Sequence, residues 1–174
     1  MMTVEEFRAL PEIQDKLFEL HDGRVVEFPR PNFGYWSIQT RLVDLLGPLT
    51  RLGALGIEFV FRPTEEHNLW AADVGFVPTE RERNIDPDDN LHGAPDLMIE
   101  IVSPGSVAAE LEEREVRCIG NGCQEFWVVF PGFQRVKVMS NDGRFQRYRA
   151  GDVIELSIAP GVKVAVDDIF RSDQ

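Results

Sequence analysis

The chain has 174 residues, of which 43% are hydrophobic and 28% are charged, and its formal net charge at pH 7 is −12. This length and composition fit one ordinary globular domain spanning residues 1–174, and they argue against a disordered segment. The acidic balance argues against a nonspecific, high-affinity nucleic-acid binder, because such proteins need clustered Lys and Arg. It does not exclude an enzyme that meets phosphates through a metal ion.

The first elements predicted are a short helix and a hairpin. Thr3 precedes Glu6 by three residues, which is the pattern of a capping box at a helix start. The strand-like runs 17–21 and 25–28 are then joined by Asp22-Gly23, a strong tight-turn pair. Glu19 therefore lies in the first strand of a hairpin.

An amphipathic helix is expected over 35–52, where apolar residues recur at spacings of three and four until Gly53 and Gly56 end the pattern. Three strands are expected next, over 57–63, 71–78 and 96–102. The polar, turn-rich segment 79–95 between the last two predicts a surface loop.

The second half predicts one helix and a run of strands. Segment 107–119 carries Glu–Arg pairs four residues apart and is expected to be a helix with its cap near Ser106. A strand-rich tail follows over 125–131, 135–140, 144–151, 153–158 and 159–170. The order of elements predicts a mixed α/β (α+β) fold with a central sheet, an N-terminal hairpin and a C-terminal β-meander.

Two features bear on the compartment. No apolar run approaches the roughly 18 residues of a membrane span, and "MMTVEEFRAL" lacks the layout of a signal peptide. We therefore expect a cytoplasmic protein with no membrane partner.

Cys118 and Cys123 are too few for a zinc site or a disulfide scaffold, so we expect small buried thiols.

Three acids stand out because they lie in predicted strands. Glu100 interrupts the apolar run "LMIEIV", Asp73 lies between "WAA" and "VGFV", and Glu19 is in the hairpin. If the strands are neighbours, these carboxylates can meet on one sheet face, where their repulsion requires protons or a cation. Oxygen-only ligands suit Mg²⁺ or Mn²⁺. The alternative is that each acid simply faces solvent, as most Asp and Glu do.

The remaining sequence patterns give weaker evidence for a functional site. "DPDDN" at 86–90 lacks the ligand spacing of a calcium loop, and the three histidines show no order typical of a catalytic triad. Arg147, Tyr148 and Arg149 on a late strand could touch phosphate, although a solvated strand face is the default interpretation.

The motifs "MTVEEFRALP", "FELHDGRVVEF", "AADVGFV", "PDLMIEIVSPGS", "QEFWVVFP" and "GDVIELSIAPGVKVAVDDIF" occur in an order that resembles the Uma family of restriction endonucleases. That family belongs to the PD-(D/E)XK nuclease superfamily. The resemblance covers nearly the whole chain and implies a restriction-endonuclease-like core with a mixed sheet flanked by helices. "PDLMIEIVSP" together with "EFWVV" is the most specific part.

The resemblance also implies roles for individual residues. Asp73 and Glu100 correspond to the acids that bind a divalent metal, and Glu19 matches a third acid of the family. The family lysine that assists attack of water corresponds to Arg114, and the usual histidine of the long helix is Tyr35 here. An arginine stays charged and can only orient groups or stabilise negative charge, so this departure bears on turnover.

Two functions follow from these observations. The first is a metal-dependent endonuclease that hydrolyses DNA phosphodiesters, with Asp73, Glu100 and Glu19 as Mg²⁺ or Mn²⁺ ligands and Arg114 stabilising charge. The second is a catalytically degenerate descendant that acts as a metal-binding or oligomeric interaction module. A homodimer is expected in either case, because it is the commonest assembly.

Overall fold

The computed structural model describes residues 1–12 and 16–171. Its helices are α1 (Val4–Arg8), α2 (Phe33–Leu45), α3 (Thr79–Glu82), α4 (Ala108–Ile119) and α5 (Val166–Phe170), with short 3₁₀ turns at Gly47–Arg51 and Pro131–Phe133. Its strands are β1 (Leu17–His21), β2 (Arg24–Phe28), β3 (Gly53–Arg62), β4 (Trp70–Pro78), β5 (Leu91–His92), β6 (Leu97–Ile101), β7 (Glu125–Phe130), β8 (Arg135–Ser140), β9 (Phe145–Arg149), β10 (Val153–Glu155) and β11 (Lys163–Ala165).

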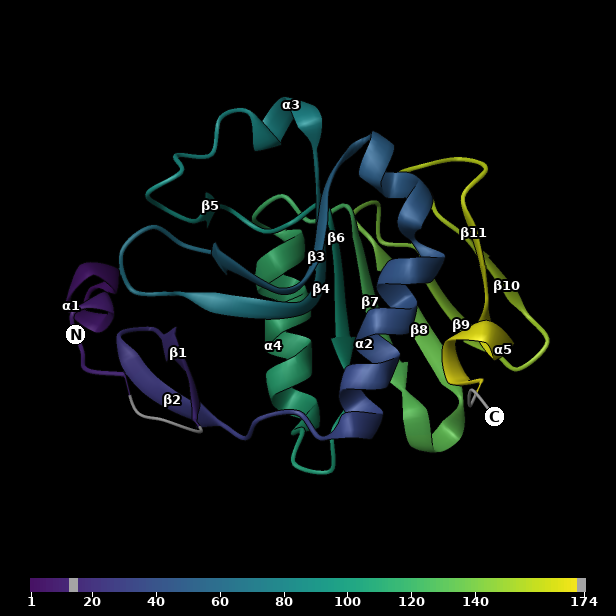
Figure 1. The fold of residues 1–174 in the computed structure, drawn as a ribbon, viewed down its shortest axis with the longest axis horizontal. Coiled ribbons are helices and arrows are strands. Elements are labelled where there is room, and N and C mark those ends of the chain that lie inside the picture. The colour runs from purple at the N-terminus through teal and green to yellow at the C-terminus, as the bar shows by residue number, and fades with distance from the viewer. Residues whose placement is uncertain (13–15, 172–174) are drawn as a thin grey trace.

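Seven strands form one mixed sheet in the order β5-β3-β4-β6-β7-β8-β9 (Figure 1). β6 pairs with β7 in parallel and β3 pairs with β5 in parallel, whereas the other neighbours are antiparallel. The parallel step from β6 to β7 needs a crossover, and α4 supplies it. The predicted mixed α+β class with a central sheet and an N-terminal hairpin is confirmed.

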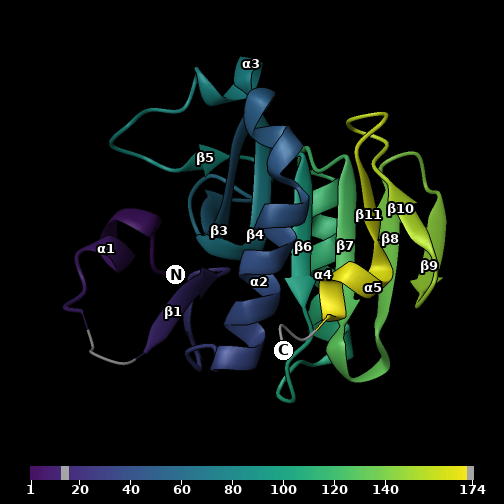
Figure 2. The ribbon, with the colours of Figure 1, turned by 45° about the vertical axis from the view of Figure 1, so that its right-hand side comes forward.

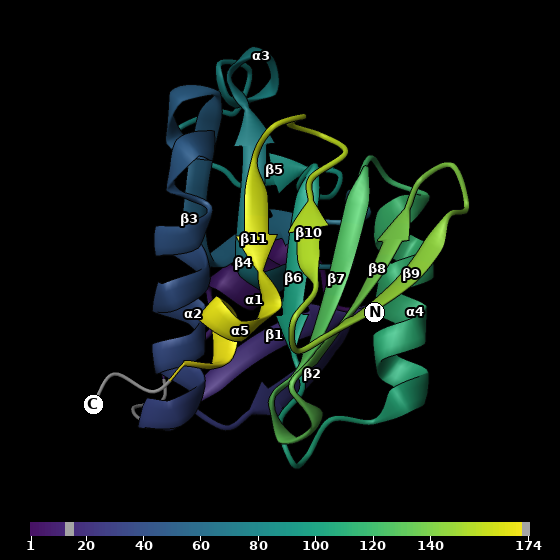
Figure 3. The ribbon, with the colours of Figure 1, turned by 90° about the vertical axis from the view of Figure 1, so that its right-hand side faces the viewer.

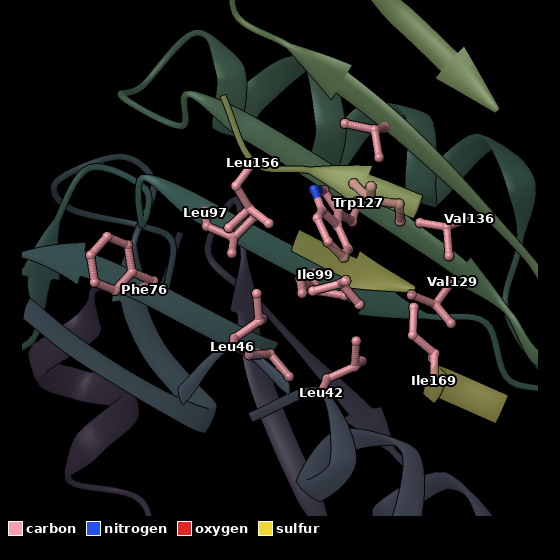
Figure 4. Close-up of a cluster of buried hydrophobic side chains, with 14 of the residues drawn as sticks. Leu42, Leu46, Phe76, Leu97, Ile99, Trp127, Val129, Val136, Leu156 and Ile169 are labelled. Carbon is pink, nitrogen blue, oxygen red and sulfur yellow. The ribbon is translucent and has the colours of Figure 1, made fainter. Parts of the chain in front are cut away.

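Helices cover both faces of the sheet. Figure 2 shows α2, α5 and the β10–β11 pair on one face and α4 on the other. The larger apolar core lies under α2 and α5, and Figure 4 shows Leu42 and Leu46 of α2 packed toward Ile99, Trp127 and Val129 of the strands. A second core under α4 contains Met98, Phe126, Cys118 and Cys123. β6 is therefore buried on both faces, as its continuous apolar sequence predicts.

The N-terminal elements form as predicted. Thr3 and Glu6 make both bonds of a capping box. Asp22 and Gly23 join β1 to β2 with φ angles of 46° and 72°, which are the two positive values that a tight hairpin turn of type I′ requires. β1 also contacts the sheet through reciprocal backbone hydrogen bonds between Leu20 and Leu69. These hydrogen bonds place the β1 side chains beside the start of β4.

The expected helix over 35–52 is wrong at its end. α2 stops at Leu45, a 3₁₀ turn with proline near its start follows, and β3 already begins at Gly53. Proline lacks the N–H that would continue the helix ladder, whereas the apolar spacing runs on through the turn. Gly53 also belongs to the strand for a steric reason, because a Cβ there would lie 2.0 Å from the Val77 carbonyl oxygen.

Two other expectations need correction. The segment 79–95 is not wholly loop, because it contains α3 and β5. The predicted C-terminal meander is confirmed for β7, β8 and β9, which are consecutive antiparallel strands of the main sheet, but β10 and β11 pair separately and cover its α2 face (Figure 3). The predicted strand over 153–158 accordingly shortens to β10. The helix over 107–119 starts at Ala108 without a side-chain cap, and Ser106 bonds Ser103 instead.

Both cysteines are buried free thiols, as expected. In the described part of the chain, none of the helices has the length and apolar character needed to span a bilayer.

Candidate active site

The four predicted site residues come from four elements: Glu19 from β1, Asp73 from β4, Glu100 from β6 and Arg114 from α4. Arg114 connects two of the acids. Its Nη1 donates to Glu19 Oε2 at 2.8 Å, and its Nη2 donates to Glu100 Oε1 at 3.1 Å and to the Ala71 carbonyl at 2.7 Å. Asp73 and Glu100 occupy facing positions of antiparallel neighbours, since Val74 pairs with Ile99. The fold therefore brings these four residues to one end of the sheet.

Glu19 is held as a carboxylate. Its Oε2 also lies 2.7 Å from His21 Nε2, and its Oε1 accepts a hydrogen bond from the Ala71 N–H at 3.0 Å. Burial alone raises the pKa of Glu19, but the charge of Arg114 and these hydrogen bonds outweigh it and lower the pKa below its usual value. Both oxygens are thus committed to protein partners.

Asp73 carries a raised pKa. Its Oδ2 accepts a hydrogen bond from the Ile101 N–H at 2.6 Å, and the Tyr35 hydroxyl interacts with the same carboxyl. Burial raises the pKa of Asp73 to about 6, and the negative charge of Glu58 adds to that effect. Burial raises the pKa of Tyr35 as well, so the phenol stays protonated and can donate.

Glu100 is the most buried of the three predicted site acids, with only 8% of the residue exposed. Burial raises its pKa well above the usual value, and the neighbouring charges of Asp73 and Glu19 act in the same direction, against Arg114. Among the described residues, Arg114 is its one side-chain partner, and it reaches only Oε1. With both carboxyls ionised, Asp73 and Glu100 would carry more negative charge than one guanidinium neutralises.

Arg114 is fixed from several directions. The guanidinium carbon lies 4.9 Å from the centre of the Trp70 ring, which also stacks on His21 and contacts Arg117. The two acids raise the pKa of Arg114 above its ordinary value despite burial. A guanidinium in this state can donate hydrogen bonds and stabilise negative charge, but it cannot accept a proton.

Two polar residues of the site were not predicted. Gln39 of α2 is fully buried, and its Nε2 donates to Glu58 Oε1 at 2.6 Å and to the Asp73 carbonyl at 3.3 Å. Its Oε1 is buried without a partner among the described residues. Glu58 lies opposite Asp73, where the pairing of β3 with β4 skips one position, and its φ of 49° is strained for a residue with a side chain.

The sequence did contain a sign of both. Glu58 stands in "GIEFVF" as Glu100 stands in "LMIEIV", an acid inside an apolar strand. Gln39 lies three residues before Leu42, on the inward stripe of the helix, where a polar residue needs a partner. Both follow the reasoning that identified Glu100.

The site offers two carboxylates, which are ligands that suit a hard divalent cation. Magnesium commonly takes one or two protein carboxylates and completes its shell with waters and substrate phosphates. Asp73 and Glu100 supply such a pair, and the unpartnered Gln39 oxygen adds a further acceptor nearby. Among residues 1–12 and 16–171, no group of three or more His, Cys, Asp or Glu side chains is arranged to hold a metal. Glu19 is committed to Arg114, so it stands apart from that pair.

Comparison with known proteins agrees with this fold. No curated protein matches the chain. A crystal structure from Anabaena variabilis ATCC 29413, described as a "putative nuclease belonging to DUF820", matches with a TM-score of 0.82 and 22% sequence identity over 98% of each chain. At that identity the likeness shows the fold. The model of the Uma2 family, described as "Putative restriction endonuclease", matches residues 4–167. The chain therefore belongs to the Uma2 family, a family of restriction-endonuclease-like nucleases.

Proposed function

We propose that the protein is a metal-dependent endonuclease that hydrolyses phosphodiester bonds in DNA. The observation that carries the proposal is the buried pair of Asp73 and Glu100, incompletely neutralised by Arg114 at the end of the sheet. Membership of the nuclease family supports the reaction class.

In this proposal Asp73 and Glu100 hold a Mg²⁺ or Mn²⁺ ion. When bound, such an ion polarises a phosphate and lowers the pKa of a bound water. The Ile101 N–H and the Tyr35 hydroxyl orient the Asp73 carboxyl from two sides. Gln39 and Glu58 then act as positioning residues, because Gln39 links the Glu58 carboxylate to the Asp73 backbone.

Arg114 takes the place of the family lysine. It is held charged between Glu19 and Glu100, so it would stabilise the negative charge that develops on the phosphate in the transition state. Glu19 contributes by orienting the guanidinium and by keeping it charged. The proton of the attacking water must pass to another acceptor, because Arg114 cannot take it.

A nicking assay tests this function. Supercoiled plasmid is incubated with the protein and Mn²⁺ or Mg²⁺. The same assay is run with the variant Glu100→Gln and with the control variant Glu112→Gln, which changes an exposed residue of α4. The expected result is nicking by the unmodified protein and by Glu112→Gln, abolished by EDTA and reduced at least a hundredfold in Glu100→Gln. Equal nicking by all three proteins would remove the assigned site.

One observation favours the second candidate, a catalytically degenerate protein that serves as a metal-binding or oligomeric interaction module. Arg114 already bridges two of the acids, which a lysine could do only as a single point charge. The variant Arg114→Lys separates the two functions in the same assay. Nicking by the variant alone would identify the natural protein as a degenerate enzyme, whereas nicking by the unmodified protein supports the endonuclease.

We also propose that the protein acts in the cytoplasm as a homodimer. The argument for the dimer is general, because closed two-fold assemblies are the commonest and a second copy would offer a second site for the opposite DNA strand. Light scattering in line with gel filtration checks it against the chain mass of 19.8 kDa.

A further inference from the structure

An arginine strip lies on one face of the β8–β9 hairpin. Register pairs Arg135 with Arg149 and Lys137 with Arg147, so these four side chains share a face of the sheet. Lys137 is neutralised by Glu115 of α4 at 2.7 Å. We use "arginine strip" for Arg135, Arg147 and Arg149, which are all exposed. Among the described residues, none of the three pairs with a carboxylate.

Without a bound partner, the arginine strip destabilises the folded chain. Cations directly opposite each other on antiparallel strands repel, and Arg135 and Arg149 form such a pair without a carboxylate to neutralise either of them. The chain has 30 acidic residues with which it could neutralise them, and it has used acids for many other arginines, including Arg62, Arg81 and Arg117. A bound polyanion would relieve the repulsion that the strip carries.

The spacing suits a row of phosphates. Arg147 and Arg149 are two residues apart on one strand, roughly 7 Å, and Arg135 lies roughly 5 Å across from Arg149. Guanidinium groups bind phosphate through two parallel hydrogen bonds, which makes arginine more suitable than lysine for this role. Phe145 adds an exposed ring on the same face, beneath the Arg147 guanidinium at 5.3 Å.

The strip also has a defined position relative to the site. Glu100 pairs with Val128, Val128 with Lys137 and Lys137 with Arg147, so all four lie in one line across β6, β7, β8 and β9. Three strand spacings put the Arg147 backbone roughly 14 Å from that of Glu100, on the sheet face that α4 covers. Figure 3 shows β8 and β9 beside α4 at this edge. A duplex is wide enough to reach both places.

We propose that the arginine strip binds the phosphate backbone of the DNA substrate and orients it toward the Asp73–Glu100 site. This inference rests on the proposed function, because it takes DNA as the substrate. It assigns to three surface arginines a sequence-independent part of the affinity, which an otherwise acidic protein needs.

Binding of a labelled 30-base-pair duplex in EDTA, where no cleavage occurs, tests the strip separately from the chemistry. The strip variant carries the three substitutions Arg135→Gln, Arg147→Gln and Arg149→Gln. The control variant carries Arg24→Gln, Arg51→Gln and Arg83→Gln, which remove the same charge from exposed arginines outside the β8–β9 hairpin. The slope of log K against log salt should fall by about 2 to 3 in the strip variant and by much less in the control. The charge-retaining variant with three lysines should keep the slope.

Several results would overturn the inference. One is an equal salt slope in the strip variant and in the unmodified protein, and another is the absence of measurable DNA binding by the unmodified protein. A third is a change of oligomeric state in the strip variant with unchanged DNA affinity. That result would indicate that the strip binds the acidic surface of a second copy of the chain. The nicking assay is scored independently: loss of nicking in Glu100→Gln with DNA binding unaffected by the strip removes this inference and leaves the endonuclease standing.

Discussion

At the scale of single residues, Arg114 makes the most consequential contacts of the site. It is buried with Glu19 and Glu100 as its ion-pair partners, so its removal leaves carboxylates in a desolvated position. Breaking a buried ion pair from one side costs about 3 to 5 kcal/mol. We expect Arg114→Met to lower the free energy of unfolding by about that amount in urea denaturation. The exposed control Arg83→Met should change it by less than about 0.5 kcal/mol, and equal effects would show that the bridge is unimportant for stability.

The raised pKa of Asp73 predicts a pH-dependent stability. The folded protein holds the proton more tightly, with a pKa of about 6 against 3.8 in an unfolded reference. Stability contributed by this group is therefore present below about pH 4 and is lost as the pH rises through about 6. Asp73→Asn should be indistinguishable from the unmodified protein near pH 4 and more stable at pH 8, by up to about 3 kcal/mol.

Urea titrations at pH 4, 6 and 8 in EDTA measure this difference, with the exposed Asp88→Asn as the control. A difference that does not change with pH would contradict the assigned pKa. Added Mg²⁺ should reverse the order at pH 8, because a cation that binds the native carboxylates stabilises only the unmodified protein.

Part of the site could be predicted from sequence and part could not. Acids within apolar strands mark buried positions, and this reasoning identified Glu100 and, with the hairpin turn, Glu19. It could not supply the distances, because whether Asp73 and Glu100 face each other depends on the register of β4 against β6. The contact of Gln39 with Glu58 depends on a backbone φ of 49° in β3, which no residue type in that strand indicates.

At the scale of elements, the pairing of β3 with β4 rests on a close approach at Gly75. A Cβ at this position would lie 2.7 Å from the Cβ of Phe59, whereas Gly56, its partner across the ladder, has no atom within 4 Å of such a Cβ. We expect Gly75→Ala to destabilise the protein by about 1 to 3 kcal/mol through overpacking. Gly56→Ala should be neutral or slightly stabilising. Similar thermal midpoints for the two variants would show that the ladder accommodates the methyl group.

Elements that depend on local residues could be predicted from the sequence, whereas elements that depend on distant contacts could not. Turn and cap residues act locally, so the hairpin and the start of α1 were predicted to within a residue. The end of α2 was not, because its apolar spacing continues through a 3₁₀ turn that only the proline interrupts. The separate pairing of β10 with β11 depends on packing over the α2 core, which their sequence alone does not express.

At the scale of the whole molecule, we propose that residues 1–174 form a single domain. The support is a sheet that runs without interruption from β5 to β9 and two cores that share its strands. Unfolding in urea should then be one cooperative transition, with coincident midpoints by tryptophan fluorescence and far-ultraviolet circular dichroism. Separate midpoints would indicate two independently folding units.

The proposed function depends above all on a divalent cation site formed by Asp73 and Glu100. Calorimetric titration of Mn²⁺ into the unmodified protein, Glu100→Gln and Glu112→Gln measures it without reference to any activity. We expect one Mn²⁺ site in the unmodified protein, the same affinity in Glu112→Gln, and at least tenfold weaker binding in Glu100→Gln. Equal Mn²⁺ affinity in the unmodified protein and Glu100→Gln would contradict it.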